Sequence, residues 1–133
     1  MLNTDLFKLP ASFKYILPLA LVFAAAELFF GMNYPMFRDE FYYLDCANHL
    51  SFGYVDHPGF SIFILLIWKT IFGNSLIAVR VLPALTGAAI ILVTAKITEE
   101  MGGSKTAQVL SAVAVFCVPT FLVMGGFYGG SFF

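Results

Sequence analysis

The chain has 133 residues, the length of one ordinary soluble domain, but its composition excludes that class. Hydrophobic residues make up 60% and charged residues 11%, against roughly 45–50% and about 25% in soluble domains. The formal net charge of -1 offers no basic patch for a phosphate backbone, which excludes nucleic acid as a partner. Cys46 and Cys117 match no metal or redox spacing, so we expect two buried small hydrophobic residues. The composition indicates a membrane protein.

Long uncharged stretches divide the chain into expected helices. Residues 15–37 carry a single charge, Glu27, and no charged residue follows Lys105. A helix needs about 20 apolar residues to cross a bilayer. The pattern therefore predicts an all-α membrane protein, one partial transmembrane domain over residues 1–133 with about four spans. These lie near residues 15–34, 58–73, 77–98 and 106–124, with turns at Gly73-Asn74 and Gly102-Gly103.

Three features of the spans leave alternatives open. The stretch 58–73 is short for a perpendicular span, so either Lys69 extends to the membrane surface or the helix lies partly in protein. Glu27 is costly in hydrocarbon and is expected to face protein or a water-filled cleft. The first apolar run followed by three alanines also imitates a signal peptide, but it continues to Phe37, which favours a span over cleavage.

Orientation follows from the basic residues. An inner N-terminus places four of them in the cytoplasm (Lys8, Lys14, Lys69 and Arg80) and three outside (Arg38, Lys96 and Lys105). Because cytoplasmic loops carry the excess of Lys and Arg, the loop 35–57 is predicted to be extracytoplasmic.

Residues 38–57 contain four of the eight acidic residues and both histidines. Within them, residues 39–50 predict a short amphipathic helix in the membrane interface. Its apolar arc is Tyr42, Tyr43, Cys46, Ala47 and Leu50.

The acidic pair at the start of that helix has two interpretations. Asp39 and Glu40 stand where the first span meets the loop, which suits interfacial chemistry. The simpler alternative makes Asp39 a helix N-cap and Glu40 a favourable charge in the first turn.

The other end of the loop carries Asp56-His57-Pro58. Pro58 fits the first position of a helix, whose free N–H groups next to His57 suit a phosphate. Asp56 either caps this helix or holds a divalent metal ion beside the phosphate.

A resemblance to the N-terminal part of bacterial family 39 glycosyltransferases rests on two runs, RDEFYYLDCANHLSFGYVDHPGF and IFGNSLIAVRVLPALTGAAIILVTAKITEEMGG. These enzymes are relatives of protein O-mannosyltransferases and of lipid A aminoarabinose transferases. The likeness covers roughly residues 15–124. It implies a GT-C fold in the bacterial inner (plasma) membrane, and transfer of a sugar from a polyprenyl-phosphate donor to a lipid or protein acceptor at the outer face.

The resemblance also implies roles by position. Asp39 matches the catalytic acidic residue and Glu40 its motif neighbour. His57 stands where relatives meet the lipid phosphate, Arg80 matches an arginine assigned here to the same donor phosphate, and Asp56 matches a position near a metal in some relatives. A carboxylate of this kind acts as general base on the acceptor hydroxyl.

Two departures from the family stand out. Gly59 follows Pro58 where relatives usually have a second proline, and family members run to several hundred residues, so we expect a truncated reading frame. The alternative function is a non-catalytic small four-helix membrane protein, an accessory or flippase-like subunit.

Overall fold

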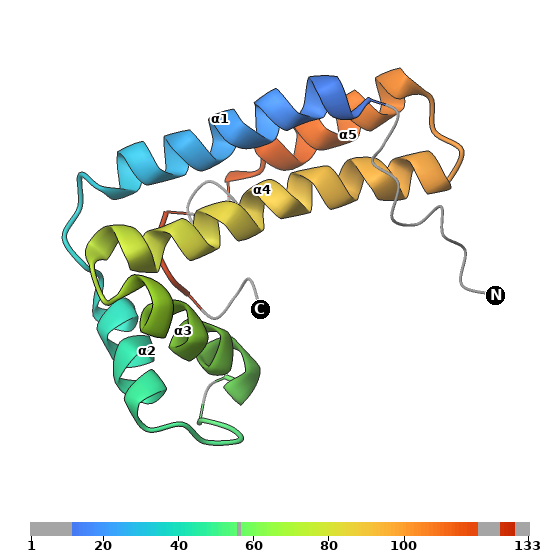
Figure 1. Cartoon of the computed structure of the whole chain (residues 1–133). Coiled ribbons are helices and arrows are strands. Elements are labelled where there is room, and N and C mark those ends of the chain that lie inside the picture. The colour runs from blue at the N-terminus through green and yellow to red at the C-terminus, as the bar shows by residue number, and fades with distance from the viewer. Residues whose placement is uncertain (1–11, 56, 120–125, 130–133) are drawn as a thin grey trace.

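The structure is a computed structural model that describes residues 12–55, 57–119 and 126–129. This part of the chain forms five helices and no named strand, which confirms the all-α prediction (Figure 1). The helices are α1 (Phe13–Gly31), α2 (Arg38–Asn48), α3 (Gly59–Phe72), α4 (Leu76–Glu100) and α5 (Lys105–Phe116).

The helix boundaries follow local sequence rules. Ser75 and Ser104 precede α4 and α5, and the side chain of each accepts a hydrogen bond from a backbone N–H of the first turn, at 3.2 and 3.3 Å. Gly73 and Gly102 end α3 and α4 with φ of 81° and 83°, values that favour glycine. Both predicted turns are therefore confirmed. The last helix was predicted to reach residue 124, but α5 ends at Phe116, and residues 120–125 lie outside the described residues.

Helices α1, α4 and α5 lie side by side and share one core (Figure 1). α4 runs opposite in direction to α1 and α5. Gly87 of α4 lets the Phe23 ring of α1 approach closely, because a Cβ at residue 87 would collide with that ring. The buried core residues are Ile16, Ala20, Phe23, Ile91, Ala95 and Ala112.

Helices α2 and α3 form a hairpin that extends away from the end of this layer where α1 ends and α4 begins (Figure 1). They share a second core with the first half of α4. Its buried members are Cys46, Ala47, Ile62, Leu65, Val79, Leu82 and Tyr128. The predicted apolar arc of residues 39–50 therefore turns partly toward α3, while Tyr42 and Leu50 stay exposed.

Two of the helices are long and apolar enough to cross a membrane. α1 has 19 residues and α4 has 25, or about 28 and 37 Å of helix. The described parts of α3 and α5 have 14 and 12 residues, so four spans are not shown. α3 packs against α2 and the first half of α4, which matches the alternative of a helix partly enclosed by protein.

One expectation about the cysteines was wrong. Cys46 is buried between α2 and α3 as predicted, but Cys117 is exposed. Cys117 is the C-cap of α5, and the helix turns its other face toward α1 and α4.

Candidate functional site

The site begins with an ion pair at the first turn of α2. Glu40, with 0% of its surface exposed, faces Arg80 of α4, which is 2% exposed. Arg80 Nε donates to Glu40 Oε1 at 3.1 Å, and Arg80 Nη2 donates to Glu40 Oε2 at 3.0 Å. This two-pronged geometry matches the planar guanidinium to the carboxylate.

The remaining donors of Arg80 bind the segment that connects α1 with α2. Nη1 donates to the carbonyl oxygens of Gly31 and of Tyr34, the latter at 2.9 Å, and Nη2 donates to the carbonyl of Pro35 at 2.8 Å. A guanidinium has five N–H donors, and five bonds to protein oxygens are accounted for here. Arg80 therefore fixes the end of α1, the connection and the start of α2 together.

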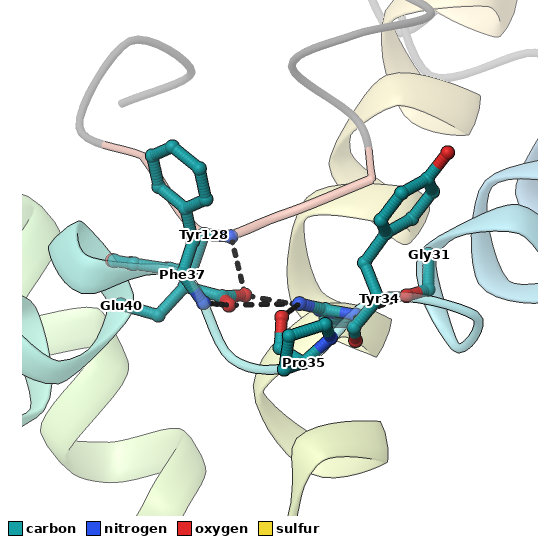
Figure 2. A network of polar contacts seen from close by, with 7 residues as sticks. Gly31, Tyr34, Pro35, Phe37, Glu40 and Tyr128 are labelled. Carbon is teal, nitrogen blue, oxygen red and sulfur yellow. Dashed lines mark hydrogen bonds and ion pairs between the residues drawn. The ribbon is translucent and has the colours of Figure 1, made fainter.

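Glu40 accepts two further hydrogen bonds, both from backbone N–H groups (Figure 2). One comes from Phe37, the N-cap of α2, at 2.7 Å, and the other from Tyr128 at 3.2 Å. Glu40 is thus the carboxylate that caps α2. The alternative in which Asp39 is the N-cap is wrong, because the N-cap is Phe37 and the helix begins two residues earlier than that alternative requires.

Tyr128 brings a distant segment into this cluster. Its side chain is fully buried, its hydroxyl donates to the Ser61 carbonyl of α3 at 2.8 Å, and its ring meets that of Tyr43 edge-on at 5.6 Å. Burial, and then the nearby Tyr43, raises the pKa of the Tyr128 hydroxyl well above its usual range. The hydroxyl stays protonated and keeps its donor role between α2 and α3.

Asp39 differs from its neighbour in being accessible. Its side chain is 50% exposed, and its nearest ionic contact is the exposed Arg38, with Nε 3.7 Å from Oδ1. An exposed pair of this kind contributes little to stability. The structure therefore separates the two acids into a buried structural carboxylate, Glu40, and a carboxylate open to solvent, Asp39.

His57 lies at the other end of the hairpin, 9% exposed and enclosed by three tyrosine rings. The Tyr54 ring stacks on it at 4.8 Å, and the rings of Tyr42 and Tyr43 meet it edge-on at 5.6 and 4.9 Å. Tyr42 stands one helical turn after Asp39, on the same face of α2. Tyr42 therefore contacts His57 and stands one helical turn from Asp39.

The loop between α2 and α3 folds back on the end of α2. Tyr54 N–H donates to the His57 carbonyl at 3.1 Å, and the Tyr54 hydroxyl donates to the carbonyls of Cys46 and His49 at 2.9 and 3.0 Å. Pro58 is the N-cap of α3, one residue before the predicted position. A Cβ on Gly59 would lie 2.5 Å from the Ser51 carbonyl oxygen, so a second proline, as in the resembled family, would not fit here.

The predicted metal site stays a prediction. Asp56 lies outside the described residues, and among the residues that are described no group of three or more His, Cys, Asp or Glu side chains is placed to hold a metal ion.

Sequence reasoning missed the contributions of Tyr128 and of the three carbonyls that bind Arg80. Every residue has a backbone carbonyl, so the sequence does not show which carbonyls bind Arg80. Tyr128 stands in a C-terminal segment that has no sequence pattern linking it to Glu40. The comparisons with known proteins add no assignment: no protein family, no curated protein and no solved structure matches this chain.

Proposed function

We propose that the chain is the N-terminal part of a GT-C glycosyltransferase that moves a sugar from a polyprenyl-phosphate donor to a lipid or protein acceptor. The observation that carries the proposal is the separation of the acidic pair. Glu40 is held by Arg80 and caps α2, and this leaves Asp39 half exposed in the first turn of α2. The resemblance of the loop to family 39 enzymes supplies the reaction class.

The arrangement of α1 and α4 supports an extracytoplasmic site in a bacterial inner membrane. If both cross the bilayer, the start of α1, the end of α4 and the start of α5 share one side, and α2 and α3 share the other (Figure 1). Lys14, Lys96 and Lys105 then stand on the first side, and Arg38, Lys69 and Arg80 on the second. Lys8 precedes α1 in the sequence, so the count is four basic residues against three. Because cytoplasmic flanks carry more Lys and Arg, the hairpin faces outward.

Asp39 has the exposure that a general base requires. An acceptor hydroxyl attacks the anomeric carbon of the donor sugar and gives its proton to the Asp39 carboxylate. The bond between that carbon and the phosphate oxygen breaks, and the polyprenyl phosphate leaves with the electron pair. The leaving group is stabilised by N–H donors and cations and needs no proton.

His57 is proposed to bind the donor phosphate at the start of α3. The prediction that Arg80 binds the same phosphate stays untested, but Arg80 already donates five hydrogen bonds to the protein. We assign Arg80 and Glu40 a positioning role instead, since together they fix the turn that carries Asp39.

Donor binding tests the proposal directly. The purified chain in lipid nanodiscs is titrated with undecaprenyl phosphate and, as the matched control, with undecaprenol, which has the same tail but no phosphate. The proposal expects saturable binding that depends on the phosphate. Equal binding of the two molecules would favour the alternative, a non-catalytic four-helix membrane protein.

A further inference from the structure

A pocket of about 390 Å³ opens beside the last turn of α1. Glu27 and Arg80 supply its charged groups. Its aromatic walls come from α1, the connection to α2 and the 126–129 segment: Phe30, Tyr34, Phe37 and Phe127. Neither Asp39 nor His57 lines it.

Glu27 is the unusual group in this pocket. It is 5% exposed, and among residues 12–55, 57–119 and 126–129 no hydrogen bond or ion pair to its carboxylate is found. A buried carboxylate without a partner is costly, and an ionised one requires a cation or several hydrogen-bond donors nearby. The pocket that it lines is the open route by which such a partner reaches it.

Arg80 does not fulfil that requirement. Its guanidinium also lines the pocket, but its charge is matched by Glu40, and its N–H groups are directed at Glu40 and at three backbone carbonyls. The Glu40–Arg80 pair is therefore close to neutral as a unit. Glu27 is therefore left without a counter-ion among the described side chains.

The aromatic walls favour the same kind of ligand as the carboxylate does. The Phe37 and Phe127 rings are 5.4 Å apart, and Phe30 and Tyr34 are 64% and 70% exposed beside them. Aromatic faces attract ammonium groups, and a carboxylate next to such faces adds a counter-ion. Anions are disfavoured here by Glu27.

We propose that this pocket binds the ammonium headgroup of an ethanolamine lipid from the outer leaflet, with Glu27 as the counter-ion. The depth of the pocket favours a lipid over a soluble amine. Glu27 precedes the end of α1 by four residues, roughly 6 Å of helix rise, which is the depth where headgroups meet acyl chains. The exposed Phe29 and Phe30 on the same turn give acyl chains an apolar surface. The inference does not depend on sugar transfer.

Lipid competition tests it. The chain is purified from bilayers containing equal amounts of phosphatidylethanolamine and phosphatidylglycerol, and retained lipids are identified by native mass spectrometry. Wild type is expected to retain the ethanolamine lipid about tenfold or more over the glycerol lipid, a ratio typical of one hydrogen bond to a charged group. Glu27→Gln is expected to abolish this preference, and the control Glu100→Gln, on an exposed part of α4, is expected to keep it.

A second measurement needs no variant. Butylammonium and butanol are titrated into the wild-type chain in detergent, and the aromatic NMR signals are followed. Stronger binding of butylammonium supports the ammonium site. If butylammonium binds more strongly than butanol while no lipid preference is found, the ligand is a soluble amine and the lipid assignment is wrong. Equal binding of the alcohol, or a lipid preference that Glu27→Gln leaves intact, would overturn the ammonium site itself.

Discussion

At the scale of single residues, the two adjacent acids at the start of α2 have opposite environments. Glu40 accepts four hydrogen bonds and is fully buried, whereas Asp39 is half exposed and, among the described residues, its ionic contact is with a surface arginine. Their order along the chain explains this difference. The third residue of a helix can reach back to its N-cap, as Glu40 does to Phe37, and the second residue points away.

The stability of the site is expected to depend on Glu40 far more than on Asp39. Removing one partner of a buried ion pair costs about 3–5 kcal/mol, because the other charge is left uncompensated. Glu40→Gln should therefore lower the thermal unfolding midpoint in detergent strongly, and the matched change Asp39→Asn should leave it nearly unchanged. A small effect of Glu40→Gln would show that the Arg80 contact contributes little.

Tyr128 offers a finer test of the same cluster. Tyr128→Phe keeps the ring and removes the hydrogen bond to the Ser61 carbonyl. The expected loss is about 0.5–1.5 kcal/mol of unfolding free energy, the usual net value of such a bond. Phe127→Leu, which keeps a large apolar side chain without touching this bond, serves as the comparison. No measurable loss for Tyr128→Phe would place the tail outside the folded core.

His57 is expected to matter for donor affinity. His57→Ala should weaken undecaprenyl phosphate binding by roughly 1.5–3 kcal/mol, the range for hydrogen bonds to charged groups. His57→Lys should be milder, because a cation remains near the phosphate. Isothermal titration of both variants in nanodiscs measures this difference. Near-wild-type affinities of both variants for undecaprenyl phosphate would show that His57 does not bind the phosphate and only packs among the tyrosine rings.

At the scale of the helices, periodicity and turn residues predicted all five elements to within a few residues at most ends. The serines before α4 and α5 and the glycines after α3 and α4 set helix ends through contacts only a few residues away. These helix ends can therefore be predicted from the sequence alone. The role of α3 was not predictable in this way. The composition of α3 is that of a membrane span. Only its contacts with α2 and Tyr128 in the folded structure show that it packs beside α2.

The placement of α3 gives a topology prediction. With α3 outside the bilayer, the turn between α3 and α4 lies on the same face as the loop 35–57; with four spans it lies on the opposite face. In a chain with Cys46 and Cys117 replaced by alanine, Asn74→Cys should react with a membrane-impermeant thiol reagent in intact cells.

Two further positions calibrate that experiment. Ser51→Cys in the hairpin loop should also react in intact cells, and Lys105→Cys at the start of α5 should react only after lysis. Labelling of residue 74 only after lysis would support the four-span topology instead. Labelling of residue 51 only after lysis would place the hairpin in the cytoplasm and remove the case for an extracytoplasmic enzyme.

At the scale of the whole molecule, the long helix α4 joins two cores. Its first half packs on the α2–α3 hairpin and supplies Arg80, and its second half packs on α1 and α5. The candidate site lies where these cores meet. Its residues come from α1, the first loop, α4 and the 126–129 segment, so contacts across 40 to 88 residues define it. Sequence patterns show relations between residues a few positions apart. They therefore pointed to Asp39 and His57 as site residues, but not to the Glu40–Arg80 network that fixes the turn carrying Asp39.

The most direct test of the proposed enzyme is a chromosomal Asp39→Asn change in cells that make the protein, with Asp45→Asn as the control on the exposed side of α2. Sugar transfer to membrane lipids and proteins is followed by mass spectrometry. We predict that Asp39→Asn leaves the protein folded and present but lowers transfer at least about 100-fold, the lower range for loss of a general base, whereas Asp45→Asn has no effect. Transfer within about threefold of wild type in the Asp39→Asn cells would contradict a catalytic role for Asp39.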